Sequence, residues 1–300
     1  MERLLALLLC AAAACAPAGT APGELGAVAT VYPLAWVVAE VAPEAAVESL
    51  ASRGQDPHDL ELSPGQRALV ESADVVAYLG DIGFQPQIEA ALQDTSATLV
   101  DASAVAGNRL RTVSGHDDGE HGDAAVDPHL WFDALVMADI ATAVGDAFAT
   151  ADPAGATGYR DRAAEVAREL RGTAEDIAGL LSDCRHDEVV VGHEAYAYLL
   201  APHDIAQHGI SSASGHSAAS PQDIAVLADE IRALGLPAVL TEPVEGRTDA
   251  QVVAREARVE LVEIYSLDIV DDEQAAKGFP QLLREQAEAV ARAAACSGSP

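Results

Sequence analysis

The stretch "DPAGATGYRDRAAEVARELRGTAEDIAGLLSDC", residues 152–184, is the part of the sequence that decides the fold. Its period predicts one amphipathic helix of about 28 residues, capped by Asp152, opened by Pro153 and about 40 Å long. Short apolar runs of a different kind lie on both sides of it, so we expect this helix to be a connector. Its apolar side chains recur at three- and four-residue spacing, at Tyr159, Ala163, Val166, Leu170, Ala174, Ile177 and Leu181.

Strand-like and helical patterns alternate before and after this helix. "VVAYLG" (75–80) and "ATLVDAS" (97–103) precede it, and "DEVVVG" (187–192), "LPAVLTE" (236–242) and "VELVEIYS" (259–266) follow it. Such alternation favours mostly parallel sheets covered by helices on both faces. We therefore predict an α/β protein with two α/β lobes joined by one long rigid helix. The expected divisions are an export segment and tether (1–23), an N-terminal lobe (24–151), the connecting helix (152–183) and a C-terminal lobe (184–300).

The charge balance restricts the class of partner. The 300 residues include 17 basic and 48 acidic side chains, for a formal net charge of −31. This charge argues against binding to nucleic acid or to an anionic membrane surface, and it favours cations near the protein. Solubility alone is the alternative reason for such acidity.

The first 24 residues, "MERLLALLLCAAAACAPAGTAPGE", indicate export. The apolar run of residues 4–14 follows Arg3 and is too short to span a bilayer, as in a secretory signal. Cys15, preceded by three alanines, resembles the lipid-attachment cysteine of bacterial lipoproteins, which would anchor the protein at the cell surface. The alternative is ordinary cleavage at residues 16–18, which would release a soluble periplasmic protein.

Two cysteines remain outside the export segment. In an oxidising compartment Cys184 and Cys296 would most simply form one disulfide, and two buried thiols are the alternative.

Two copies of the tripeptide Asp-Pro-His draw attention to the histidines. "QDPHDL" (55–60) contains His58 and "VDPHLW" (126–131) contains His129, while His193 and Asp268 each follow a predicted strand of the second half. Ligands of open α/β sheets bind beyond the carboxyl ends of the strands. We therefore expect these four side chains to meet in one cleft between the lobes.

Three imidazoles and one carboxylate form a tetrahedral set that suits Zn²⁺. The prolines stiffen the loops that carry the first two histidines. The neighbouring carboxylates of Asp56 and Asp127 could accept the second ring N–H of a histidine. For any one histidine taken alone, a surface or structural role is the alternative.

The same residues carry a family resemblance that covers nearly the whole chain after the export segment. The chain resembles the zinc and manganese solute-binding proteins of bacterial ABC importers, called cluster A-I. This resemblance implies two lobes bridged by a helix, with the metal between them and bound by His58, His129, His193 and Asp268. The third position is histidine in the family's zinc binders and glutamate in its manganese binders, so His193 indicates zinc. The matching motifs are "QDPHDLELSPGQRALVESADVVAYLG" (55–80), "DPHLWFD" (127–133), "VVGHEAYAYLL" (190–200), "AVLTEP" (238–243) and "IYSLD" (264–268).

Two further carboxylates are considered near the site. Glu242 corresponds to a family carboxylate, which we expect to support the ligands and balance charge, and to replace Asp268 if Asp268 points away. Asp271 is a weaker substitute, and its position favours the start of a helix. The short loop "SGHDDGEHGD" (114–123), with His116 and His121, is either a weak metal-capture site or a solvated acidic loop.

The predicted function is a zinc carrier, not an enzyme, that delivers Zn²⁺ to an ABC permease in the membrane. A zinc metallochaperone is a candidate loading partner, and the carrier is expected to be a monomer. A manganese or iron carrier of the same fold and a surface adhesin are the alternatives. An exported zinc hydrolase is disfavoured because "GHEAY" (192–196) is followed by Ala197, where a zinc-protease motif needs histidine, and because four protein ligands leave no position for water. The long helix should resist wide hinge closure, so metal release is expected to need only local loop movement.

Overall fold

The computed structural model describes residues 25–51, 57–58, 60–113, 125–210, 220–243 and 247–298. Several predictions concern residues outside these ranges: the export segment with Cys15, the carboxylate of Asp56, and the loop with His116 and His121. They stay predictions.

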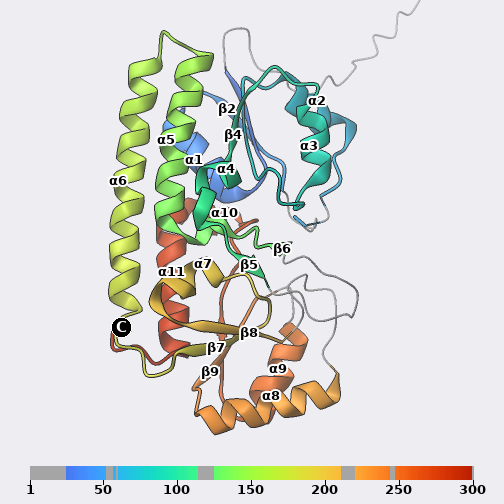
Figure 1. The fold of residues 1–300 in the computed structure, drawn as a ribbon, viewed down its shortest axis with the longest axis vertical. Helices are drawn as coiled ribbons and strands as arrows, with labels where there is room; N and C mark the ends of the chain where they lie inside the picture. Colours follow the sequence, from blue (N-terminus) through green and yellow to red (C-terminus); the bar gives the residue numbers. More distant parts are fainter. Residues whose placement is uncertain are drawn as a thin grey trace, which may run out of the picture.

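The first lobe is built on a four-stranded parallel sheet of order β2-β1-β3-β4. Helices α1 and α4 lie on the side of the sheet that faces the long helices, and α2 and α3 cover the other side (Figure 1). A short antiparallel hairpin, β5–β6, follows this unit. The elements are β1 (Gly26–Ala29), α1 (Tyr32–Val41), β2 (Ala46–Ser49), α2 (Pro64–Ser72), β3 (Val75–Tyr78), α3 (Pro86–Leu92), β4 (Thr98–Asp101), α4 (Ala102–Ala106), the 3₁₀ turn η1 (Gly107–Arg109), β5 (Thr112–Val113) and β6 (Ala125–Val126).

The second lobe repeats this plan with a four-stranded parallel sheet of order β10-β9-β7-β8. Helices α7 and α11 lie on the side facing the first lobe's long helices, and α8 and α9 cover the opposite side (Figure 1). The predicted α/β class with two parallel sheets is confirmed. The elements are β7 (Glu188–Val191), α7 (Ala197–Leu200), the 3₁₀ turn η3 (Ala201–His203), β8 (Ala206–Gly209), α8 (Pro221–Leu234), β9 (Ala238–Thr241), α9 (Arg247–Ala257), β10 (Glu260–Glu263), α10 (Asp272–Lys277) and α11 (Phe279–Ala293).

The central strands β1, β3, β7 and β9 are mostly apolar because both of their faces are buried, whereas the edge strands β2, β8 and β10 carry exposed polar residues. In β1, Ala27 and Ala29 contribute to the largest core, whereas Val28 packs with residues of α2 and α3 on the other face. In β7, Val190 packs with residues of α8 and α9, while the valines on either side of it join the largest core. Successive side chains of a strand point to opposite faces, so β1 and β7 each contribute to two cores.

Local capping residues in the sequence start several helices. Ser63 and Ser220 each form a capping box with the residue three positions later, at the starts of α2 and α8. Gly235 ends α8 in the left-handed conformation. Asp271 caps α10, as expected for a residue at the start of a helix.

The connecting helix begins later than the sequence predicted. Helix α5 (Ala134–Ala151) ends at Asp152, and α6 (Ala156–Leu180) starts four residues further on. Asp152 does not cap α6. Its carboxylate accepts hydrogen bonds from the N–H groups of Ala154 and Gly155, and so closes the turn between two antiparallel helices. The predicted 28-residue helix is therefore a turn followed by 25 helical residues, about 37 Å long.

Helix α5 starts only after a short turn that follows His129. A 3₁₀ turn, η2 (Leu130–Phe132), follows His129, and Asp133 then caps α5 through hydrogen bonds from two backbone N–H groups. Helix α5 is apolar and long enough to cross a membrane, but 61% of it is buried inside this protein, as in a core helix. Helix α6 lies alongside α5 and extends from the first lobe to the second, where it ends near the last turn of α11 (Figure 1).

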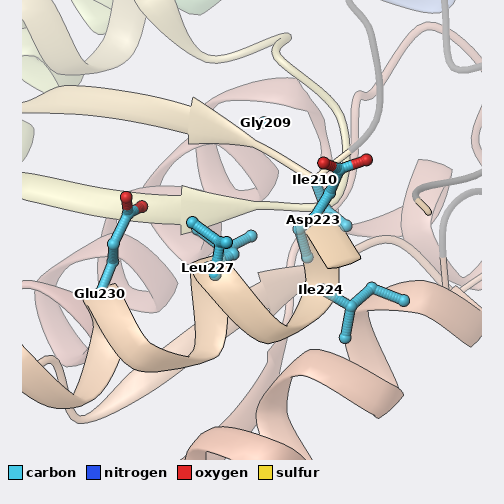
Figure 2. A pocket seen from close by; sticks show the side chains of 7 residues that line it. Gly209, Ile210, Asp223, Ile224, Leu227 and Glu230 are labelled. Atoms are coloured by element: carbon cyan, nitrogen blue, oxygen red, sulfur yellow. The ribbon is translucent and has the colours of Figure 1, made fainter. Parts of the chain in front are cut away.

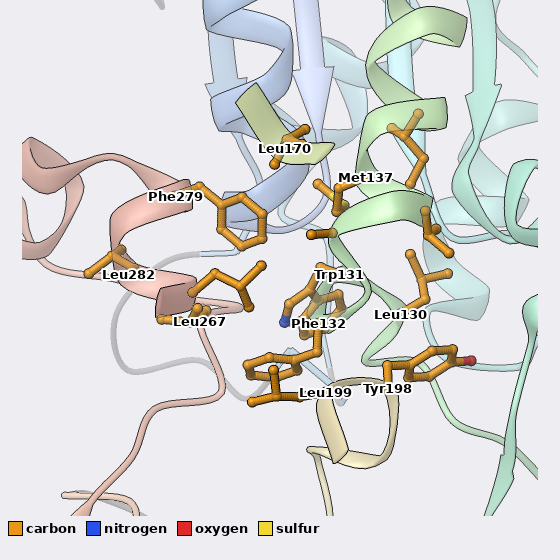
Figure 3. Close-up of a cluster of buried hydrophobic side chains, with 14 of the residues drawn as sticks. Leu130, Trp131, Phe132, Met137, Leu170, Tyr198, Leu199, Leu267, Phe279 and Leu282 are labelled. Carbon is orange, nitrogen blue, oxygen red and sulfur yellow. The ribbon is translucent and has the colours of Figure 1, made fainter. Parts of the chain in front are cut away.

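One hydrophobic core is continuous through both lobes. Figure 3 shows its centre, where Trp131 and Phe132 from the first lobe meet Leu199 from α7 and Phe279 from α11. Each of these side chains is at most 1% exposed. Since a packed core transmits strain and leaves few voids, the lobes are joined by packing as well as by the connecting helix.

A disulfide joins Cys184 and Cys296. It settles the sequence alternative in favour of pairing over two buried thiols. The bond ties the segment after α6 to the segment after α11, near the C-terminus, where these two helices end close to each other (Figure 1).

Candidate metal centre

Three of the four predicted ligands come together. The candidate ligand atoms of His58, His129 and His193 all lie within 4.8 Å of one another. Their ring centroids are 5.1–6.0 Å apart. His58 and His129 belong to the first lobe and His193 to the second, so the cluster lies at the boundary between the lobes. It is the one group of three or more potential ligands of this kind within the described ranges.

His129 is oriented by the aspartate of its own Asp-Pro-His tripeptide. Its Nδ1 lies 2.7 Å from Asp127 Oδ1, which also accepts the His129 backbone N–H at 3.0 Å. The predicted role of Asp127 is thus confirmed. The other ring nitrogen, Nε2, is buried and has no hydrogen-bond partner among the residues that the structure describes. A buried nitrogen without a partner is costly unless an ion or another group completes it, so this atom indicates a ligand between the histidines.

His193 lies two residues beyond the end of β7 and is oriented by Glu242, which directly follows β9. Its Nδ1 is 3.2 Å from Glu242 Oε1, and that oxygen also accepts a 2.7 Å hydrogen bond from the Tyr196 hydroxyl. Burial opposes ionisation of Glu242, but the hydrogen bonds and the charge of His193 outweigh it and lower the pKa of this carboxyl. An ionised Glu242 holds the proton of His193 on Nδ1 and leaves Nε2 as the donor atom for an ion.

His58 is positioned by neighbours from the segment before α3. The edge of its ring meets Phe84, with centroids 4.8 Å apart. The side-chain amide of Gln85 donates a 3.1 Å hydrogen bond to the carbonyl oxygen of Pro57. Gln85 is almost fully buried, so this contact fixes the backbone beside the ligand.

Asp268 lies five residues beyond β10 and is buried, but the structure does not place it within the histidine cluster. Its Oδ1 accepts hydrogen bonds from the Ser266 hydroxyl at 2.7 Å and from the Ile269 N–H at 2.9 Å. Burial raises the pKa of Asp268, and the nearby charge of Glu242 adds to the shift while His129 opposes it. The Asp268 carboxylate is therefore close enough to interact electrostatically with His129 and Glu242. Its role as fourth ligand stays a prediction.

A pocket of about 220 Å³ adjoins the cluster. His58 and His129 line it together with Phe84, Pro128 and Glu194, among others. This opening gives an ion a route to two of the three imidazoles. It also places a carboxylate, Glu194, beside that route, although the Glu194 Oε1 accepts a hydrogen bond from the Gly209 N–H.

A second hollow, of about 210 Å³, lies between β8 and α8 (Figure 2). Ile210, Ile224 and Leu227 supply apolar side chains to it, and Asp223 and Glu230 supply carboxylates. Among the described residues, its lining includes no imidazole or thiol, the donors that zinc prefers. The histidine cluster is therefore the better metal site.

Comparison with protein families gives a match over residues 27–293 to the family described as zinc-uptake complex component A, periplasmic. The chain belongs to this zinc-uptake family. The match covers both lobes and all three histidines. The family is one of transport components and not of enzymes, in agreement with the prediction from the sequence.

Individual relatives of this zinc-uptake family member are distant. The zinc-binding lipoprotein AdcA of Streptococcus pneumoniae serotype 4 is 25% identical over 285 residues, which cover 92% of this chain and 57% of AdcA. The manganese-binding lipoprotein MntA of Halalkalibacterium halodurans is 24% identical over 216 residues, 71% of this chain and 69% of MntA. The chain spans a little over half the length of the AdcA relatives that it matches.

The solved structures confirm the fold. The periplasmic zinc-binding protein TroA of Treponema pallidum superposes with a TM-score of 0.77 at 20% identity, covering 90% of this chain and 99% of TroA. The predicted two-lobed architecture is therefore shared with proteins of known structure.

Several residues that support the site in this zinc-uptake family member escaped the sequence reasoning. Gln85, Tyr196 and Glu194 have ordinary positions in their local patterns. Tyr196 lies three residues after His193, and this short spacing is the one feature of the sequence that could have indicated that Tyr196 lies near the site. Its hydrogen-bond partner, Glu242, is 46 residues further along the chain.

Proposed function

We propose that this protein is an extracytoplasmic zinc-binding component that captures Zn²⁺ between its lobes and delivers it to an ABC permease for uptake. The observation that carries this proposal is the meeting of three imidazoles, His58, His129 and His193, within 4.8 Å across the lobe boundary. Family membership supports the same conclusion.

The donor set favours zinc by its chemistry. Zn²⁺ binds imidazole nitrogens at about 2.0–2.1 Å in tetrahedral sites, so the nitrogens of a loaded site lie about 3.4 Å apart. The present cluster needs only a small contraction to reach that spacing. Two of its three rings are already oriented by carboxylates, Asp127 and Glu242, which fix the tautomer and raise the basicity of each ligand.

Asp268 is the proposed fourth ligand. Its Oδ1 is held by two hydrogen bonds, and Oδ2 is the oxygen that would reach the ion. Three neutral imidazoles and one carboxylate leave a net charge of +1 on the zinc complex, and the ionised Glu242 behind His193 balances it.

Metal competition on chelator-stripped protein tests the proposal. We expect one Zn²⁺ per chain, bound more tightly than Mn²⁺, and a loss of zinc affinity of more than about 100-fold in His193→Ala. His208→Ala is the matched control, because His208 is about half exposed and pairs with Glu188 on the second lobe's sheet. Zinc affinity unchanged in His193→Ala would overturn the ligand set.

The fourth ligand has its own test. If Asp268 binds the ion directly, Asp268→Asn should weaken zinc binding more than Glu242→Gln does. The reverse order would make Glu242 the ligand, and Asp268 would then be a residue buried for structural reasons.

A manganese or iron carrier is the second candidate, and the similarity to MntA is the observation that favours it. Three nitrogen donors suit Zn²⁺ better than Mn²⁺, which prefers oxygen ligands. Replacement of His193 by glutamate should therefore shift the preference towards manganese. Tight binding of manganese over zinc by the wild-type protein would decide for the second candidate.

The remaining parts of the proposal concern how the protein is anchored, which partner loads it and its oligomeric state. Cys15 is proposed as a lipid anchor, which mass spectrometry of the membrane-bound protein would detect as a mass increase on the new N-terminal cysteine. A zinc metallochaperone is the proposed loading partner, and the carrier is proposed to act as a monomer.

The loop of residues 114–123 is proposed as a weak capture site. Its deletion should then slow zinc transfer, and unchanged transfer and affinity would remove that role.

A further inference from the structure

A tyrosine stands behind the carboxylate that orients His193. The hydroxyl of Tyr196 donates a 2.7 Å hydrogen bond to Glu242 Oε1, and His193 Nδ1 lies 3.2 Å from the same oxygen. All three side chains are buried. Glu242 Oε1 therefore interacts with two groups, the ring nitrogen Nδ1 of His193 and the hydroxyl of Tyr196.

The phenol is itself fixed in place. The backbone N–H of Tyr196 donates to the side-chain oxygen of Gln207 on β8 at 3.0 Å, and its ring packs against Phe132 with centroids 5.1 Å apart. Tyr196 has no exposed surface. Since the ring cannot follow a rotating carboxylate, the hydrogen bond to Tyr196 holds Glu242 in its present orientation.

The orientation of Glu242 decides which chemistry the site offers. In its present orientation Glu242 acts on the ion only through His193, and the ligands at this part of the site are the imidazole nitrogens. Without the hydrogen bond from Tyr196, Glu242 can rotate, and one of its carboxylate oxygens can then bind the ion directly. Nitrogen donors favour Zn²⁺, whereas added carboxylate oxygen favours harder ions such as Mn²⁺.

We propose that Tyr196 is a positioning residue that determines metal specificity: its hydroxyl keeps Glu242 from becoming a ligand and so maintains the preference for zinc over manganese. This inference rests on the proposed function, because it assumes that the three histidines bind the metal. Discrimination between zinc and manganese would then depend partly on Tyr196, a side chain that does not contact the ion.

The test is Tyr196→Phe, which removes one oxygen atom and keeps the ring that packs against Phe132. We expect zinc affinity to fall by about tenfold and manganese affinity to stay constant or rise, so that the ratio of the two falls by tenfold or more. Bound Co²⁺ reports the geometry directly, because its visible absorption weakens as the coordination number rises from four to five. We expect that weakening in the variant.

Tyr159→Phe is the matched control. Tyr159 is also buried and also donates to a carboxylate, Asp152, but at the start of α6, away from the histidines. It should leave the zinc-to-manganese ratio and the Co²⁺ spectrum unchanged. The thermal unfolding midpoints of the zinc-free variants show whether either substitution acts through folding.

The double variant Tyr196→Phe with Glu242→Gln completes the test. If Glu242 has become a ligand in Tyr196→Phe, removing its charge should restore the four-coordinate Co²⁺ spectrum. An unaltered metal ratio and Co²⁺ spectrum in Tyr196→Phe, with tight zinc binding retained, would overturn this inference alone. Wild-type protein that binds no zinc at the histidines would instead overturn the proposed function.

Discussion

The indole Nε1 of Trp131 donates a 2.7 Å hydrogen bond to the backbone oxygen of Ser266, joining the first lobe to the segment that carries Asp268. A second bond in the same region runs from the Tyr32 N–H to the backbone oxygen of Asp268 at 2.9 Å. Tyr198, on α7, likewise donates to the backbone oxygen of Asp127 at 3.0 Å. The two lobes are thus connected by hydrogen bonds beside the candidate ligands as well as by one core.

Domain motion on metal binding should therefore be small. A wide hinge rotation would break these bonds and expose the shared core around Trp131, whereas movement of single ligand loops would leave both intact. We expect small-angle scattering profiles of zinc-free and zinc-loaded protein to superimpose. A large change in the radius of gyration would show that the connecting helix and the shared core do not restrain the lobes.

Asp127 should contribute to zinc affinity without touching the ion. In Asp127→Asn the amide no longer provides a charged acceptor for His129 Nδ1, so the tautomer that presents Nε2 is less favoured. We expect zinc affinity to fall by about 10–100-fold in chelator competition. Asp152→Asn, which alters the turn before α6 and the acceptor of the Tyr159 hydroxyl, is the control and should bind zinc as the wild type does.

The disulfide should stabilise the fold but leave the metal site unaffected. Cys184 and Cys296 lie 112 residues apart in sequence, so the bond removes much freedom from the unfolded chain. We expect the double serine variant to lose about 2–4 kcal/mol of unfolding free energy in urea titrations. Its zinc affinity should be that of the wild type, and a parallel loss of affinity would mean that the bond acts on the site.

The stability of the zinc-free protein should depend on pH in part through His203. Partial burial lowers the pKa of His203 below its usual value of 6.5, although the charge of Asp204 acts in the opposite direction. Below pH 6.5 the unfolded chain binds a proton that the folded protein does not yet take up. Stability that is fully present above pH 6.5 is therefore lost as the pH falls through the folded pKa.

His203→Gln should reduce this loss. Urea unfolding at pH 7.5 and pH 5.5 would measure it, with chelator present to exclude metal. If the wild type and the variant lose stability equally between the two pH values, His203 makes no contribution.

Local sequence was enough to predict much of the fold. The capping boxes at Ser63 and Ser220 depend on hydrogen bonds over three residues, and the buried central strands coincide with short continuous apolar runs such as those of β3 and β7. The boundary of the connecting helix was wrong, because Asp152-Pro153 has the local form of a helix start. Only the packing of α5 against α6 shows that these residues form the turn between the two helices.

The sequence by itself determined which imidazoles to consider, since the repeated Asp-Pro-His tripeptide and the positions after strands identified His58, His129 and His193. It also indicated the contact of Asp127 with His129, because the two residues are only two positions apart in the chain. The family resemblance indicated that Glu242 supports the ligands, but only the tertiary structure decided that Glu242 orients His193 and that Tyr196 holds Glu242. Tyr196 and Glu242 are 46 residues apart, and a contact over that distance exists only after β7 and β9 pair in one sheet. Hydrogen bonds between such distant residues depend on the packed fold, which short-range patterns do not contain.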